Sequence, residues 1–281
     1  MLRVALPNKG QLADPAREML REAGYPAAHA ARELVVQDPD NDVEFFFLRP
    51  RDIAVYVASG QLDIGITGLD LVLDSGVETD TLLELGFAPS TFRFAAPKGT
   101  ATSVAELAGK RIATSYAGLL GTRLSELGIE ATVVKLDGAV ENAVRLGVAD
   151  AVADVVATGT TLKQAGLEVL GEPLLVSQAL LVQRAGAAHS YEIDTFVRRL
   201  QGVIVARAYV LVDYDIPVER VEEACRITPG IESPTVSPLH DKGWVAVRAM
   251  VPQRGVHRIM DELYDLGARG ILVTDIHACR L

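Results

Sequence analysis

The chain has 281 residues, which is long enough for one large domain or for two to three small ones. Apolar residues account for 49% and charged residues for 23%, a globular composition that excludes collagen, coiled-coil and intrinsically disordered proteins. The formal net charge of −10 predicts that the chain binds neither nucleic acid nor anionic membranes, so an anionic ligand needs a local site.

The first 90 residues alternate short apolar strands with helices. A helix whose apolar residues recur at helical spacing ends at Gly24, and a second helix is predicted over Arg51–Ser59. The strands around these helices are predicted over Arg3–Leu6, Val43–Leu48 and Asp63–Thr67. Strands separated by helices in this order are typical of a largely parallel sheet.

A second series of the same kind begins near Thr91. Its strands are predicted over Arg111–Thr114, Thr132–Lys135, Ala151–Val156 and Gln178–Gln183, with helices around Gly121–Leu127 and Ala139–Leu146. A further helix over Ile193–Ala206 follows. The first two thirds of the chain are therefore expected to form α/β structure with mainly parallel sheets.

The tail of the chain has a different order of elements. Its strands are predicted at Tyr209–Asp213, Thr235–Pro238, Trp244–Val251 and Ile271–Thr274, and its helices at Val218–Arg226 and Val256–Leu266. This is the βαββαβ order of a ferredoxin-like unit. We expect it to fold as a separate C-terminal unit, and the change of pattern alone marks its boundary.

A turn rich in hydroxyl groups and glycine follows the strand at Ala151–Val156. Its residues Thr158, Gly159, Thr160 and Thr161 lead into a helix. Such a turn aims backbone N–H groups and hydroxyl donors at one point, where the helix N-terminus adds partial positive charge. These features suit a phosphate. A plain helix cap has the same composition, and the spacing alone leaves both interpretations open.

Several charged residues follow predicted strand ends. Lys9, Arg49 and Asp70 each come just after a strand of the first series, and Asp154 lies near the end of a strand of the second series. Ligands bind at the carboxyl ends of strands in open α/β sheets, so we expect Lys9, Arg49 and Asp70 to share one rim. Glu141 and Asp154 could accept hydrogen bonds from sugar hydroxyls. Taken singly, Lys9, Arg49 and Asp70 are also compatible with solvated surface positions, and Glu141 with an exposed helix position.

The sequence shows no signature of a protein nucleophile. The five histidines have no metal-ligand spacing, and the two cysteines cannot form a disulfide framework or a structural zinc site. If the chain is an enzyme, we expect direct displacement, with positioning and charge stabilisation accelerating the reaction. A small-molecule sensor without catalysis is the competing interpretation. The absence of a signal-peptide pattern and of long apolar runs favours a cytoplasmic protein with no membrane partner.

Three motifs together resemble the ATP phosphoribosyltransferase family. They are Pro7-Asn8-Lys9-Gly10-x-Leu12, Asp63-Ile-Gly-Ile-Thr-Gly68-x-Asp70, and Glu141-x5-Gly147-x-Ala149-Asp150-x3-Asp154-x3-Thr158-Gly159-x-Thr161-Leu162. The tail, with Asp215-Ile-Pro and Pro229-Gly-Ile-Glu-Ser-Pro234-Thr235, is similar to the regulatory domain of the long form. The resemblance covers the whole chain.

The resemblance implies a fold and a reaction. Two lobes of the periplasmic-binding-protein type would comprise residues 1–90 with 184–207 and residues 91–183, followed by a ferredoxin-like regulatory domain over 208–281. ATP and phosphoribosyl pyrophosphate would meet between the lobes, and adenine N1 would attack the ribose without a protein base. Mg²⁺ would be held mainly by pyrophosphate, with no dedicated protein ligands. Histidine would inhibit through the tail of a dimer that assembles to a hexamer.

The resemblance also assigns roles to residues. Lys9 and Arg49 would be the catalytic cations near the phosphates, and Asp70 would lie in the nucleotide site. Substrate would further contact Glu141, Asp154, Thr158, Gly159, Thr160, Thr161 and Leu162. Relatives often carry a larger or charged residue at the position of Thr160. The short hydroxyl here makes a side-chain phosphate contact less expected than backbone contacts. Histidine would bind near Asp215, Thr235 and Gly270.

Overall fold

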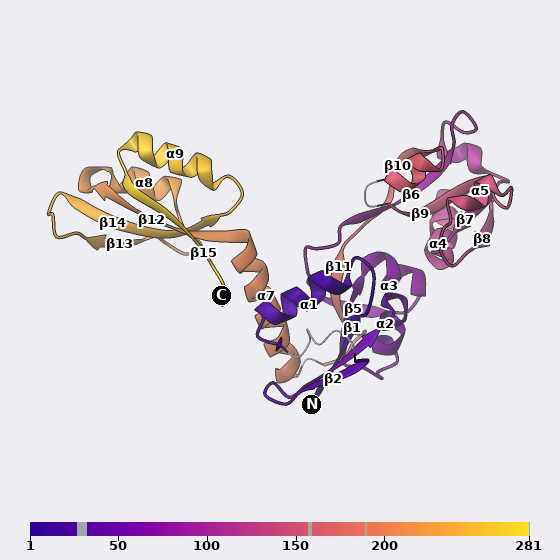
Figure 1. Cartoon of the computed structure of the whole chain (residues 1–281), viewed down its shortest axis with the longest axis horizontal. Coiled ribbons are helices and arrows are strands. Elements are labelled where there is room, and N and C mark those ends of the chain that lie inside the picture. The colour runs from indigo at the N-terminus through magenta and orange to yellow at the C-terminus, as the bar shows by residue number, and fades with distance from the viewer. Residues whose placement is uncertain (27–32, 157–158, 189, 281) are drawn as a thin grey trace. The chain divides into compact units, whose positions relative to one another are not determined.

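The computed structural model of the chain describes residues 1–26, 33–156, 159–188 and 190–280 (Figure 1). The chain divides into two compact units, the first comprising Met1–Arg21 with Tyr25–Val197 and the second Glu22–Gly24 with Arg198–Leu281. Among the described residues, the first unit contains a six-stranded and a five-stranded sheet and the second a four-stranded sheet. The predicted α/β fold class is confirmed.

The six-stranded sheet forms the first lobe. Its order is β2 (Val35–Asp38), β3 (Val43–Leu48), β1 (Leu2–Pro7), β4 (Ile64–Gly68), β11 (Ala179–Arg184) and β5 (Thr79–Glu84). Strands β3, β1 and β4 are parallel, whereas β2 and β11 pair antiparallel with their neighbours. The helices of this lobe are α1 (Ala13–Glu22), α2 (Pro50–Ala58), α3 (Leu69–Ser75) and the beginning of α7 (Tyr191–Ala208).

Helix α2 begins with Pro50, whose fixed φ suits the first helical position, and it packs on the first sheet through Ile53 and Val57. Gly65 of β4 makes this packing possible. A Cβ atom at Gly65 would lie 2.6 Å from Cγ2 of Ile53. Because α2 follows β3 directly, the chain places Arg49 and Arg51 at the carboxyl edge of the sheet.

The five-stranded sheet forms the second lobe. Its order is β10 (Leu167–Ser177), β6 (Ser90–Pro97), β9 (Ala151–Val156), β7 (Arg111–Thr114) and β8 (Thr132–Lys135). Strands β9, β7 and β8 are parallel, and β6 pairs antiparallel with β9 and β10. Its helices are η2 (Val104–Leu107), α4 (Ala117–Leu127), α5 (Asn142–Arg145) and α6 (Thr160–Gln164).

The chain passes between the two sheets twice, from β5 to β6 and from β10 back to β11. The second lobe was predicted to extend to residue 183, and this boundary is wrong. Strand β11 pairs with β4 and β5 of the first sheet, so the return crossing lies at Gln178. An apolar strand fits either sheet by its composition, and only its pairing partners decide which sheet it joins.

The second unit has the predicted βαββαβ order. Its sheet order is β13 (Thr235–Pro238), β14 (Trp244–Pro252), β12 (Tyr209–Pro217) and β15 (Arg269–Asp275), all antiparallel. Its helices after α7 are η3 (Val218–Arg220), α8 (Val221–Ile227) and α9 (Val256–Leu266). Alternate residues of β12 are buried, and the buried Tyr214 hydroxyl lies 2.7 Å from Thr228 Oγ1.

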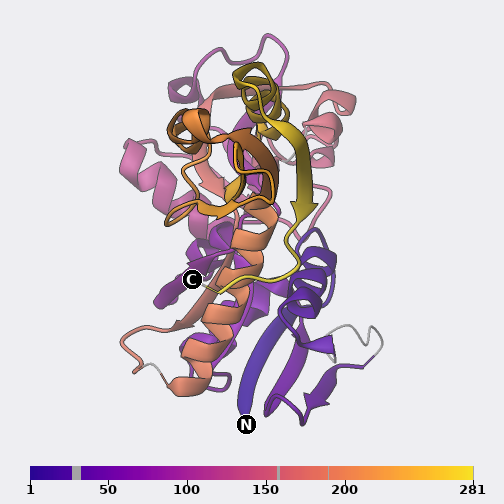
Figure 2. The ribbon, with the colours of Figure 1, turned by 90° about the vertical axis from the view of Figure 1, so that its left-hand side faces the viewer.

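This unit begins at Arg198, within α7, which is earlier than the boundary predicted at 208. The reason lies in contacts that the end of α7 makes. Arg207 donates to Glu22, and a Cβ atom at Gly202 would lie only 2.1 Å from the carbonyl oxygen of Cys279. Figure 2 shows the end of the chain running beside α7.

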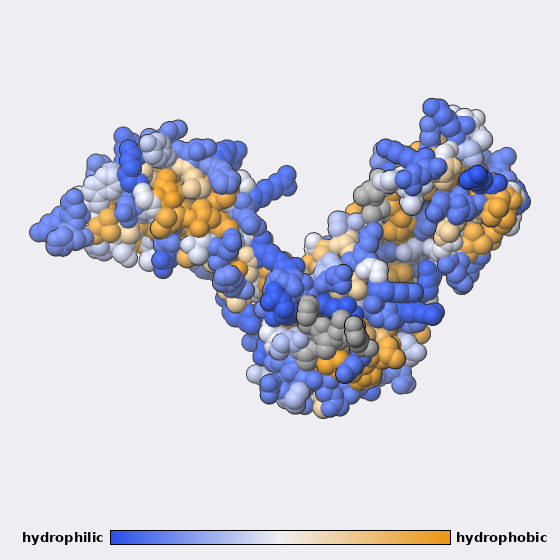
Figure 3. Space-filling view, in the orientation of Figure 1, coloured by the Kyte–Doolittle hydropathy of each residue, from blue (hydrophilic) through white to orange (hydrophobic). Residues whose placement is uncertain are grey.

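Much of the face of each unit shown in Figure 3 is hydrophilic. Within the described ranges, none of the helices has the length and apolar character needed to cross a membrane.

Candidate active site

A cavity of about 630 Å³ lies within the first unit and is lined by residues of both lobes. It contains four of the residues singled out from the sequence, namely Lys9, Arg49, Asp70 and Asp154. The first three follow β1, β3 and β4, whose parallel ends meet at one edge of the first sheet. Asp154 reaches the cavity from β9 of the second lobe.

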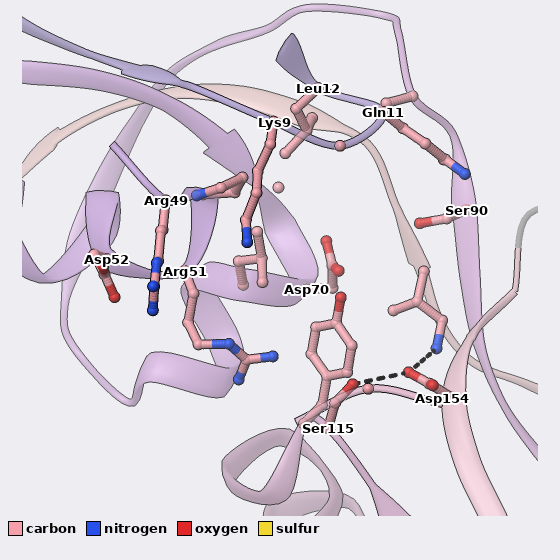
Figure 4. A pocket seen from close by; sticks show the side chains of 18 of the residues that line it. Lys9, Gln11, Leu12, Arg49, Arg51, Asp52, Asp70, Ser90, Ser115 and Asp154 are labelled. Carbon is pink, nitrogen blue, oxygen red and sulfur yellow. Dashed lines mark hydrogen bonds between the residues drawn. The ribbon is translucent and has the colours of Figure 1, made fainter. Parts of the chain in front are cut away.

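The cations of this cavity point in different directions. In Figure 4 the Lys9 and Arg51 side chains extend toward the space in front of Asp70, whereas the Arg49 guanidinium lies on the side of Asp52. Sequence reasoning missed Arg51, because a residue in the first turn of a predicted helix carries no local signal of a ligand contact. Its position two residues after Arg49 at the same strand end was the available clue.

Asp70 is a buried carboxylate with 7% of its surface exposed. Ser177 Oγ donates to its side chain at 2.6 Å, and the Asp70 backbone N–H donates to the same hydroxyl oxygen at 3.1 Å. Burial and the negative charge of the neighbouring Asp70 carboxylate raise the pKa of Tyr116. The phenol therefore stays protonated and uncharged at neutral pH.

Asp154 faces the cavity from the other lobe. Its Oδ1 accepts hydrogen bonds from Ser115 Oγ at 3.2 Å and from the Val155 backbone N–H at 2.8 Å, as drawn in Figure 4. Burial raises the pKa of Asp154 despite these two hydrogen bonds. A desolvated carboxylate with an unused oxygen is well suited to accept hydrogen bonds from a polyhydroxylated ligand.

A smaller cavity of about 170 Å³ adjoins Asp154 in the second lobe. It is lined by Glu141, Asp154, Gly159, Thr161 and Leu162 among others. Gly159 precedes α6 with φ 73°, a left-handed conformation that suits glycine, and Thr160 begins the helix. Thr158 lies outside the described residues.

Two further predicted residues differ from expectation in detail. Glu141 lies at the N-cap of α5, just before the helix rather than within it. The Leu162 side chain belongs to a core cluster of the second lobe with Val140 and Val152, so it also serves packing.

The predicted effector residues lie on the sheet of the second unit. A Cβ atom at Gly270 would lie 3.7 Å from Oδ2 of Asp215, so these two positions adjoin. Thr235 lies on β13 opposite Arg248 and is separated from β12 by β14. The structure thus brings Asp215 and Gly270 together but leaves Thr235 two strands away.

The chemistry available for a metal is limited to scattered carboxylates. Within the part of the chain that the structure describes, no three His, Cys, Asp or Glu side chains are grouped for metal binding. Asp70 and Asp154 line the larger cavity from opposite lobes and offer the hard oxygen atoms that Mg²⁺ prefers.

Comparison with known proteins extends over both units. The family profile "HisG: ATP phosphoribosyltransferase" matches residues 49–202, and "HisG, C-terminal domain" matches residues 206–278. The whole chain is 65% identical to an ATP phosphoribosyltransferase of Pseudarthrobacter chlorophenolicus and 58% identical to one of Streptomyces coelicolor, with 100% of each relative covered. A solved "ATP phosphoribosyl transferase (HisG:HisZ) complex from Thermotoga maritima" is similar with a TM-score of 0.64 and 28% identity, over 73% of this chain and 98% of that one.

Proposed function

This chain belongs to the ATP phosphoribosyltransferase family, the pentosyltransferases of the first step of histidine biosynthesis, and we propose that its interlobe cavity holds the two substrates for direct displacement. Adenine N1 of ATP attacks C1 of phosphoribosyl pyrophosphate, a bond from N1 to C1 forms, and the bond from C1 to the pyrophosphate oxygen breaks. The in-plane lone pair of N1 makes a protein base unnecessary. The observation that carries this proposal is the meeting of Lys9, Arg51 and Asp70 with Asp154 in one cavity.

The charge that develops on the leaving pyrophosphate is the main barrier to this reaction. Lys9 and Arg51 point into the cavity, and Arg49 lines it, so these three cations are assigned to the phosphates of the two substrates. The net charge of −10 opposes the capture of polyanions, which makes this local group of cations important for binding as well as for the rate.

The sugar and its 5′-phosphate are assigned to the second lobe. Asp154 and Glu141 line the smaller cavity together and accept hydrogen bonds from ribose hydroxyls. The turn that contains Thr158, Gly159, Thr160 and Thr161 presents backbone N–H groups to the phosphate. Asp70 is assigned to the nucleotide, held in its orientation by Ser177.

Mg²⁺ fits this site as an ion that arrives with substrate. The scattered carboxylates favour coordination mainly by pyrophosphate oxygens and water, with Asp70 and Asp154 as acceptors for its bound water. When bound, the ion neutralises charge on the leaving group.

The C-terminal unit is assigned to feedback regulation. We assign residues 208–281 to histidine binding, with Asp215 and Gly270 at the candidate effector site and Thr235 as its less favoured member. We assign the protein to the cytoplasm, as a dimer that associates to a hexamer.

Shortening the chain after residue 208 should leave turnover but abolish inhibition by histidine, with the assembly state measured in parallel. Inhibition of the shortened chain would exclude this site.

The experiment that tests the catalytic proposal is pyrophosphate release by the purified chain. Release should require ATP, phosphoribosyl pyrophosphate and Mg²⁺ together, and omission of any one should abolish it. Calorimetric binding of a single ligand by folded protein, with no turnover under any combination, would instead support the sensor.

A further inference from the structure

Asp74 connects the two lobes beside the substrate cavity. It lies on α3 of the first lobe, and its side chain is only 8% exposed. Its Oδ1 accepts hydrogen bonds from the backbone N–H groups of Gly118 at 2.9 Å and Leu119 at 3.2 Å, in the first turn of α4 of the second lobe. Its Oδ2 accepts a hydrogen bond from Arg51 Nη1 at 2.7 Å. One carboxylate thus contacts α2, α3 and α4.

The backbone at this point provides a second observation. A Cβ atom at Gly118 would lie 2.3 Å from the backbone carbonyl oxygen of Asp74. Only glycine permits this approach of α3 and α4, because any other residue would push the two helices apart. Close backbone contact and side-chain hydrogen bonding therefore occur at the same position, and both join the two lobes.

The contact also determines where Arg51 lies. The Arg51 side chain is 43% exposed, and the carboxylate of Asp74 restrains it at one end of the cavity. Its guanidinium lies 5.2 Å from the centre of the Tyr116 ring, on the residue that precedes α4. Asp74 thereby holds a first-lobe cation beside a second-lobe aromatic ring.

We propose that Asp74 is a positioning residue for the transfer reaction, which sets the spacing of the lobes and holds Arg51 toward the phosphates. The carboxylate accepts hydrogen bonds from the Gly118 and Leu119 amides and from Arg51. All three donors reach it together only when α3 and α4 are in contact. A negative charge at the first turn of α4 is also favoured by the helix dipole. The predicted effect of Asp74 on turnover rests on the proposed function, whereas the predicted contact between the two lobes does not.

Three single variants, one double variant and one control test the proposal. Asp74→Ala should lower kcat/KM by at least ~10-fold and should accelerate hydrogen exchange of the Gly118 and Leu119 amides in the absence of substrate. Asp74→Asn keeps an oxygen acceptor for these amides, so their protection should persist while kcat/KM still falls because Arg51 loses its ion pair. Glu78→Ala removes an exposed carboxylate near α3 and should change neither measurement.

Gly118→Ala breaks the same contact from the other lobe. It should lower kcat/KM with Asp74 intact, and the Asp74→Ala/Gly118→Ala double variant should lose much less than the product of the two single effects. Thermal unfolding of each variant shows whether it is folded, and Asp74→Asn and Gly118→Ala remain informative where Asp74→Ala does not fold.

Two results would overturn the proposal. Unchanged amide exchange in Asp74→Ala would mean that the contact does not form, and a kcat/KM within twofold of the unmodified chain in all three variants would mean that it does not position the site. Measurements on the unmodified chain distinguish failure of this proposal from failure of the proposed function. If it fails to turn over, the catalytic assignment is wrong, while amide exchange still reports whether Asp74 joins the lobes.

Discussion

Replacement of Asp154 by asparagine separates the catalytic role of this residue from its effect on stability. Asparagine has the same shape, and its Oδ1 can accept the two hydrogen bonds that Ser115 and Val155 donate at 3.2 and 2.8 Å. The substitution therefore removes the charge and leaves the local contacts in place. Any change in rate or stability then reports on the charge itself.

The expected loss of activity follows from the strength of hydrogen bonds. A hydrogen bond to a charged acceptor contributes about 1.5–3 kcal/mol and one to a neutral acceptor about 0.5–1.5 kcal/mol. The difference of about 1–1.5 kcal/mol for one ribose hydroxyl corresponds to a roughly 10-fold lower kcat/KM for Asp154→Asn. Pyrophosphate release at limiting phosphoribosyl pyrophosphate measures this value.

The expected effect on stability has the opposite sign. Burial raises the pKa of Asp154 above its ordinary value of 3.8, so the folded chain holds this proton more tightly than the unfolded chain. The stability of the unmodified chain therefore falls as the pH rises from 3.8 through the folded pKa. Asp154→Asn should have a higher Tm at pH 7 and a much smaller advantage near pH 4. Each kcal/mol of change in the free energy of unfolding corresponds to a change of roughly 2–4 °C in Tm.

Asp150→Asn is the matched control, because hydrogen bonds from Arg111 lower the pKa of Asp150 to about 2. Stability from this pair is present above pH 3.8 and is lost as the pH falls toward 2, so the control should lower Tm slightly at pH 7 and leave kcat/KM unchanged. An unchanged kcat/KM in Asp154→Asn, or a lower Tm at pH 7 in that variant, would refute the reasoning.

Three further variants test single contacts. Lys9→Met should lower kcat/KM by roughly 10–100-fold at an unchanged Tm, since a charged hydrogen bond to phosphate is lost; equal kinetics would exclude Lys9 from the phosphate site. Tyr214→Phe should reduce the free energy of unfolding by about 1 kcal/mol, measured by denaturant titration, because Thr228 loses a buried partner. Gly65→Ala should reduce it by about 1–3 kcal/mol, because its Cβ would clash with Ile53; an unaffected midpoint would show that α2 shifts freely.

Local pattern in the sequence predicted many of the regular elements of this fold but not all of them. The βαββαβ tail was predicted in order, because each of its strands and helices is bounded by its own turn residues. Strand β10 was missed, since Gly171 and Pro173 interrupt it and its pairing with β6 shifts register between Leu170 and Leu175. Helix α3 was missed because Leu69–Ser75 is too short to show helical periodicity.

The residues of the candidate site also fall into those that local sequence pattern predicted and those that it did not. Lys9, Arg49 and Asp70 were predicted because the ends of parallel strands mark one rim of the first sheet, and Asp154 because it lies near the end of a strand of the second sheet. Arg51 and Asp74 were not found, since their importance depends on contact between α3 and α4, which are separated by more than 40 residues of sequence. Which lobe β11 joins also depends on pairing with β4, a choice that composition does not make.

The double crossing of the chain has a consequence for how the protein folds during synthesis. Strand β4, all five residues of which are buried, pairs on one side with β11, whose residues lie more than 100 positions later. The second lobe, from β6 to β10, is contiguous in sequence and can collapse as soon as it leaves the ribosome. The first sheet stays incomplete, with the apolar edge of β4 unpaired, until β11 has been synthesised. During that interval the unpaired edge of β4 exposes the nascent chain to aggregation.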